Sequence, residues 1–124
     1  MKVTSQIERG IVTVTVEYGY DFFSDRKAKQ KLSEKMRDAY QKEADTKEPR
    51  LKDCIIILKA ELASSEIVHA LYELWKEVYH NDGTLYCVDY PQDYIESIFS
   101  LGLAGQPRFE LGAGVDDALA KLTA

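Results

Sequence analysis

Five consecutive apolar residues, Cys54-Ile55-Ile56-Ile57-Leu58, constrain the fold more than any other feature of this sequence. Successive side chains of a strand point to opposite faces of its sheet. A strand that is apolar at every position is therefore expected to be covered on both faces. We predict that this segment is the strand at the centre of a sheet.

Two patterns predict a mixed α/β sheet around this strand. Ahead of it, β-branched residues fill Ile11–Val16 after a turn at Gly10, and a shorter strand over Thr4–Glu8 precedes that turn, so the chain opens with an antiparallel hairpin. From residue 53 onward, strand and helix patterns alternate, which is typical of parallel strands joined by right-handed crossovers. We therefore predict an α/β fold with about five strands and about four helices. The expected parallel strands are Cys54–Leu58, Leu85–Val88 and Phe109–Leu111.

Apolar residues at helical spacing predict the helices. The first helix lies within 24–43, and the charged stretch Lys42–Lys52 after it is expected to be an exposed loop. A second helix ends at Asn81-Asp82-Gly83, a third follows Pro91, and a fourth begins near Gly114. The apolar positions of the four helices are Ala28, Leu32, Met36, Ala39 and Tyr40; Ile67, Val68, Leu71, Leu74, Trp75 and Val78; Tyr94, Ile95, Ile98 and Phe99; and Val115, Ala118, Leu119 and Leu122.

The composition favours a single domain over residues 1–124 and argues against two classes of partner. The chain has 124 residues with 45% hydrophobic content, enough to bury a core without disulfides or a structural metal. Its 16 Lys+Arg against 21 Asp+Glu give a formal charge of -5, so nucleic acid is not an expected partner. No apolar run approaches the roughly 18 to 20 residues of a membrane span. The segment Met1–Gln6 is polar and does not resemble a signal peptide, so we expect no membrane insertion.

The cysteines and histidines do not form a recognisable catalytic or metal site. Cys54 and Cys87 each lie inside an apolar strand-like run, where thiols are poor nucleophiles, and the reducing cytoplasm is the expected location. His69 and His80 stand eleven residues apart, a spacing that does not suit a shared metal ion. The stretch Gly112-Ala113-Gly114 lacks the third glycine of a nucleotide-binding loop. We expect no catalytic residue, no metal and no cofactor, and therefore not an enzyme.

One segment is a candidate functional site because it contains two serines at the expected start of a helix. It follows the central strand and opens the most apolar helix, and its sequence is Leu62-Ala63-Ser64-Ser65-Glu66-Ile67. A helix N-terminus carries unpaired N–H groups and partial positive charge. A phosphate on a serine there is accommodated electrostatically and adds about -1.5 to -2 charges. The alternative interpretation is that Ser64 caps the helix and Ser65 fills its first turn.

The order of elements and four local phrases resemble the STAS domain, the fold of bacterial anti-sigma factor antagonists. The segment DCIIILKAELASSEIVHALYELWKEV runs from a strand through a serine pair into a helix, as in that family. It is followed in the same order by DGTLYCVDYP, IFSLGL, RFEL and DDALAKL, so the resemblance is strongest over residues 53–122. The phrase ERGIVTVTVEY resembles the family's opening hairpin, whereas the polar phrase that usually follows it is replaced by GYDFFSDRKAKQ.

The resemblance implies a phosphorylation site. The phosphorylated serine of the family is the second of the pair, which corresponds to Ser65, with Ser64 as its neighbour. Two positions depart from the family pattern: Ala63 stands where an Asp is usual, and Glu66 stands where a Gly is usual. A carboxylate beside an incoming phosphate disfavours the modified state, because the two charges repel each other.

The resemblance also implies a function. The chain is expected to be a non-enzymatic module of bacterial signal transduction that binds a protein partner, such as a kinase-type anti-sigma factor. The expected partner-binding residues are Ala63, Ser64, Ser65, Glu66 and His69. The alternative is an accessory subunit of a membrane lipid or anion transport system, whose partner is a transport ATPase.

Overall fold

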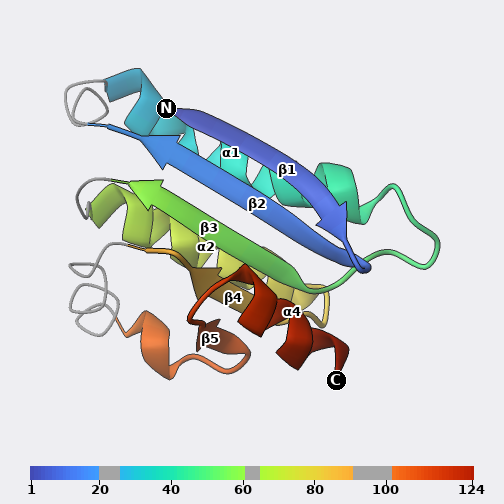
Figure 1. Ribbon diagram of the computed structural model, residues 1–124. Coiled ribbons are helices and arrows are strands. Elements are labelled where there is room, and N and C mark those ends of the chain that lie inside the picture. Colours follow the sequence, from blue (N-terminus) through green and yellow to red (C-terminus); the bar gives the residue numbers. More distant parts are fainter. Residues whose placement is uncertain (20–25, 61–64, 91–101) are drawn as a thin grey trace.

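The computed structural model describes residues 1–19, 26–60, 65–90 and 102–124, and these residues form a five-stranded mixed sheet (Figure 1). The strand order is β1-β2-β3-β4-β5; β1 and β2 are antiparallel and all other neighbours are parallel. The predicted fold class is therefore confirmed. The strands are β1 (Lys2–Glu8), β2 (Ile11–Tyr18), β3 (Cys54–Ala60), β4 (Leu85–Val88) and β5 (Phe109–Leu111).

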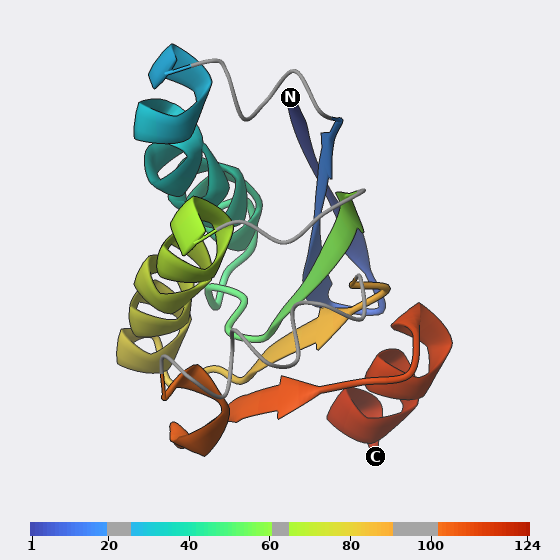
Figure 2. The same cartoon turned by 90° about the vertical axis from the view of Figure 1, so that its left-hand side faces the viewer.

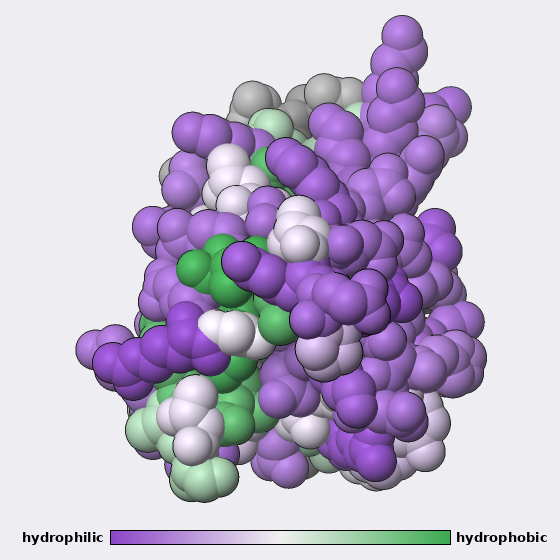
Figure 3. Space-filling model, turned by 90° about the vertical axis from the view of Figure 1, so that its right-hand side faces the viewer, coloured by the Kyte–Doolittle hydropathy of each residue, from purple (hydrophilic) through white to green (hydrophobic). Residues whose placement is uncertain are grey.

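Helices cover the sheet on both faces. The helices α1 (Arg26–Ala44) and α2 (Ser65–His80) pack against one face, and α4 (Val115–Thr123) packs against the other (Figure 2). A short 3-10 helix, η2 (Leu103–Gly105), precedes β5. On the side of the molecule drawn in Figure 3, hydrophilic residues cover most of the surface and hydrophobic atoms gather in one patch. None of the described helices combines the length and the apolar character that crossing a membrane requires.

The apolar run of β3 divides between two hydrophobic cores. Cys54, Ile56 and Leu58 belong to the large core beneath α1 and α2, whereas Ile55 and Ile57 belong to the smaller core beneath α4. All five side chains are buried. The central position and the double coverage of this strand, both predicted from the sequence, are confirmed.

The boundaries of the elements differ from the prediction by a few residues. The first strand begins at Lys2 and α1 extends to Ala44, so the charged loop begins at 45 rather than 42 and continues to the start of β3 at Cys54. The second helix ends as expected, with Asp82 in the left-handed region at φ 60°. The helix predicted after Pro91 lies outside the described residues.

A hydrogen-bonded network ties the charged loop to the end of α2. The hydroxyl of the buried Tyr40 donates to the carbonyl of Lys52 at 2.7 Å and accepts from Nδ2 of Asn81 at 2.8 Å. The Asn81 amide also donates to the carbonyl of Leu51 at 2.8 Å. Burial raises the pKa of Tyr40 to about 12, because the charged phenolate is disfavoured away from water.

The close approach of this loop to Gly83 provides a first test of the packing. A Cβ at Gly83 would overlap the carbonyl oxygen of Lys52, whereas a Cβ at Gly105 would meet no atom within 4 Å. We expect Gly83→Ala to lower the free energy of unfolding by about 1–3 kcal/mol through overpacking. The control Gly105→Ala should change it by less than about 0.5 kcal/mol. Urea unfolding measures both values, and equal stability of the two variants would contradict the described packing.

The raised pKa of Tyr40 predicts how stability changes at alkaline pH. The pKa is higher in the folded than in the unfolded chain, so its contribution is complete below pH 10 and is lost as the pH rises from 10 to about 12. This loss amounts to about 2–3 kcal/mol. Tyr40→Phe, which costs about 1–2 kcal/mol at pH 7 through the lost hydrogen bonds, should lose less stability than the wild type over that range. Urea unfolding at a series of pH values checks the prediction, and parallel curves for the two proteins would disprove it.

Candidate functional site

Ser65 is the first residue of α2 and lies at the surface. It follows the carboxyl end of β3, and its side chain is exposed. Its hydroxyl donates to Oε2 of Glu66 at 3.4 Å, a long hydrogen bond between exposed side chains. The first-turn N–H groups of a helix have no partners within the helix, so Ser65 lies where partial positive charge gathers. Ala63 and Ser64 lie outside the described residues.

His69 stands one helical turn after Ser65 and is also exposed. Its Nε2 lies 3.9 Å from Oε1 of Glu73, and Oε2 of Glu73 lies 3.3 Å from Nζ of Lys76. The carboxylate of Glu73 is therefore shared between two basic groups of its own helix. Three of the predicted site residues, Ser65, Glu66 and His69, lie on consecutive turns of one exposed helix surface.

These three residues line one wall of a hollow between α1 and α2, here called the α1–α2 groove. Its volume is about 630 Å³. The opposite wall is formed by side chains of α1. The residues that line the groove are Gln30, Ser33 and Arg37 of α1 and Ser65, Glu66, His69 and Glu73 of α2.

The α1 wall contains polar atoms that lack partners. Nε of Arg37 and Oγ of Ser33 are buried, and neither has a hydrogen-bond partner in the part of the chain that the structure describes. Such atoms cost free energy unless another group satisfies them. A guanidinium is suited to bind the paired oxygens of a carboxylate or a phosphate. The α1–α2 groove therefore has an exposed serine on one wall and, on the other, an arginine whose Nε has no hydrogen-bond partner among the described residues.

A second, apolar hollow of about 230 Å³ adjoins the groove. It is lined by Val68, Tyr72 and Leu103 together with His69, which therefore belongs to both hollows. Protein interfaces typically combine apolar anchor pockets with a polar rim. The surface around His69 has both components.

The α1 residues of the groove were not predicted from the sequence. The apolar stripe of the segment 24–43 predicts a helix but assigns no role to its polar residues. A signal was present, because Ser33 and Arg37 each follow a buried stripe residue, Leu32 and Met36, and so share one side of the helix. Only the packing of α1 against α2 identifies that side as one wall of a groove.

The cysteines and the second histidine lie away from the groove. Cys54 and Cys87 are free, fully buried thiols whose pKa values are raised by burial, so the thiolate is disfavoured, as their apolar strands predicted. His80 is the last residue of α2. The described residues include no group of three or more His, Cys, Asp or Glu side chains arranged to hold a metal ion.

Comparisons with known proteins establish the fold. No family model matches the sequence, and no curated protein matches it significantly. Among solved structures, the chain is similar to a Thermotoga maritima protein assigned to the anti-sigma factor antagonists, with a TM-score of 0.69, 9% identity, and coverage of 98% of this chain and 95% of that chain. It is also similar to the anti-sigma factor antagonist SpoIIAA in its unphosphorylated form, with a TM-score of 0.61, 12% identity, and coverage of 99% of each chain. These neighbours are STAS domain proteins, so the predicted resemblance is confirmed at the level of the fold.

Because the buried Nε of Arg37 has no hydrogen-bond partner in the described part of the chain, we predict that the fold does not require this guanidinium for its stability. Arg37→Met keeps an unbranched side chain out to the position of Nε, puts an apolar methyl group there and removes the rest of the guanidinium, so we expect the free energy of unfolding to stay within about 0.5 kcal/mol of the wild type or to rise. Gln41, one turn later, serves as the control, because its Nε2 donates to Oε2 of Glu77 at 2.9 Å. Gln41→Met should cost about 1 kcal/mol. Urea unfolding compares the two, and a larger loss for Arg37→Met would show that Arg37 has a structural role instead.

Proposed function

We propose that this chain is a non-enzymatic regulatory module that binds a protein partner through the α1–α2 groove, in the manner of an anti-sigma factor antagonist. The observation that carries the proposal is the exposed Ser65 at the start of α2, in the same groove as Arg37, whose Nε has no hydrogen-bond partner among the described residues. The STAS-like fold supports it, because both named structural neighbours are described as anti-sigma factor antagonists. The proposed setting is signal transduction in the bacterial cytoplasm.

The proposed partner surface extends from the groove over the start of α2. It comprises Ser65, Glu66 and His69 together with Arg37 of α1, and we extend it to Ala63 and Ser64, which lie outside the described residues. His69 connects the polar groove with the apolar hollow at Val68 and Tyr72. An acidic side chain of the partner pairs with Arg37, while an apolar side chain enters the hollow.

Phosphorylation of Ser65, with Ser64 as the neighbouring candidate, switches this surface. The phosphate adds about -1.5 to -2 charges next to Glu66, whose carboxylate repels it, and the helix N-terminus offsets part of that repulsion. Arg37 lines the same groove and supplies the counter-charge. A phosphate bound to Arg37 then occupies the cation that the partner's carboxylate needs, so the modification dissociates the complex.

The proposal is tested with affinity-tagged protein expressed in its native cells. Mass spectrometry of the purified protein should find phosphate on Ser65. Wild type and Ser65→Ala should copurify a kinase-type anti-sigma factor, whereas Ser65→Asp should bind that partner at least about tenfold more weakly in titration calorimetry, equivalent to about 1.4 kcal/mol. Ala120→Asp adds the same charge to an exposed position of α4, on the opposite face of the sheet, and should bind like the wild type.

Two results would overturn the regulatory proposal. Equal binding of Ser65→Asp and Ala120→Asp to the partner would exclude a switch at Ser65. A stoichiometric complex with a transport ATPase, and with no kinase-type partner, would assign the chain to the alternative class of transporter subunits.

A further inference from the structure

The outer edge of β1 is a second candidate interaction surface. β1 pairs with β2 over all seven of its residues, and its other side has no strand partner among the residues that the structure describes (Figure 1). An open edge of this length presents a row of backbone N–H and C=O groups that another strand can pair with.

The hairpin turn determines which backbone groups face this edge. Arg9 and Gly10 form a two-residue turn in which both φ angles are positive, 52° and 76°, as in a type I′ turn. Such a turn closes on a hydrogen-bonded pair, here Glu8 and Ile11, and these pairs alternate along an antiparallel ladder. The backbone groups of Val3, Ser5 and Ile7 therefore point away from β2.

The sequence of β1 is complementary to itself in one antiparallel register. When two copies of Lys2-Val3-Thr4-Ser5-Gln6-Ile7-Glu8 are paired about Ser5, Lys2 of each faces Glu8 of the other, and Val3 faces Ile7. Thr4 faces Gln6, and Ser5 faces itself. This register joins opposite charges, apolar pairs and polar pairs, which are the favourable cross-strand combinations. It also places the outward backbone groups of Val3, Ser5 and Ile7 opposite one another.

We propose that β1 pairs with β1 of a second copy of this chain about a two-fold axis at Ser5, which joins two five-stranded sheets into one continuous sheet. The contact is isologous, as the commonest homodimers are, because each copy contributes the same strand in the same register. The dimer leaves the α1–α2 groove open, since the groove lies on the other side of α1.

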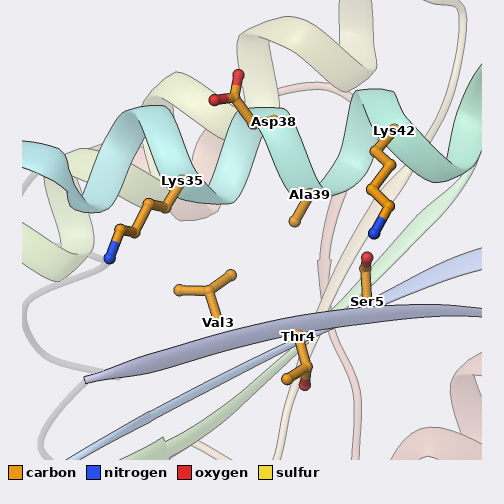
Figure 4. Close-up of a pocket in the computed structure, with 7 residues that line it drawn as sticks. All are labelled: Val3, Thr4, Ser5, Lys35, Asp38, Ala39 and Lys42. Carbon is orange, nitrogen blue, oxygen red and sulfur yellow. The ribbon is translucent and has the colours of Figure 1, made fainter.

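The surface between β1 and α1 has room for the second copy to approach β1. A hollow of about 640 Å³ lies there, and Figure 4 shows Val3 and Ser5 directed toward α1 while Thr4 points to the opposite face. The α1 side of the hollow carries both signs of charge, so a second copy meets opposite as well as like charges. Its lining residues are Val3, Thr4, Ser5, Lys35, Asp38, Ala39 and Lys42.

Cysteine cross-linking tests the register. In the proposed dimer the two Ser5 Cα atoms lie about 5.5 Å apart, within the range that a disulfide spans. Ser5→Cys should form a covalent dimer under mild oxidation. Thr4→Cys is the matched control, because it is more exposed but faces Gln6 of the other copy, so it should stay uncross-linked. The native Cys54 and Cys87 are buried and provide no competing thiol.

Reversing the charges of Lys2 and Glu8 tests the interface without an added cysteine. Wild type should sediment as a dimer in analytical ultracentrifugation, and Lys2→Glu should raise the dissociation constant about tenfold, because it places a second carboxylate opposite Glu8 of the other copy. The double variant Lys2→Glu/Glu8→Lys restores opposite charges across the axis and should recover wild-type affinity. Lys2 also faces Glu17 within the same chain, a contact that the double variant does not restore, so recovery is specific to the dimer.

Three results would overturn the dimer. The dimer is excluded if the wild type sediments as a monomer at its highest attainable concentration. In that case the charged residues of β1 protect an open strand edge from pairing. Equal cross-linking of Ser5→Cys and Thr4→Cys excludes the register. Failure of the double variant to recover affinity, with thermal unfolding like that of Lys2→Glu, excludes the pairing of Lys2 with Glu8.

Discussion

The double coverage of β3 is the constraint on which the rest of the structure depends. A strand that is apolar at every position is stable only with helices on both faces of its sheet, and each parallel crossover from it must begin at its carboxyl end. The crossover helix α2 therefore starts beside that end, where Ser65 opens it at the surface. The location of the candidate site is thus a consequence of how the hydrophobic core is built, and the same core holds α1 beside α2 to complete the groove.

The sequence predicted the features that depend on local patterns. The hairpin followed from β-branched residues beside Gly10, the covered strand from the run at Cys54–Leu58, and the start of α2 from the serines before an apolar stripe. It did not predict Ser33 and Arg37, because their role arises when two helices distant in sequence pack together. A polar residue beside an apolar stripe looks the same in sequence whether it faces water or a neighbouring helix.

The charges of Glu66 and Arg37 have opposite effects on the proposed phosphorylation of Ser65. Glu66 opposes a phosphate on Ser65, and in isolation this argues against modification. Arg37 lines the same groove and forms no ion pair among the described residues. The groove therefore contains an acid on α2 and a base on α1, and the proposed phosphate would have a counter-charge within its own site. In the proposed switch, a glutamate at this position would weaken the modified state and so make the modification easier to reverse.

The narrow apolar stripe of α1 explains how one helix serves two surfaces. Leu32, Met36, Tyr40 and Ala44 recur every four residues and are all fully buried, so the helix contacts the core along a single line. The residues after each stripe position face α2, as the Gln41 to Glu77 hydrogen bond shows. Those before it face β1, where Oγ of Ser5 donates to Oε1 of Glu43 at 3.0 Å. A wider stripe would have buried one of these polar sides, and either the α1–α2 groove or the margin of β1 would have closed.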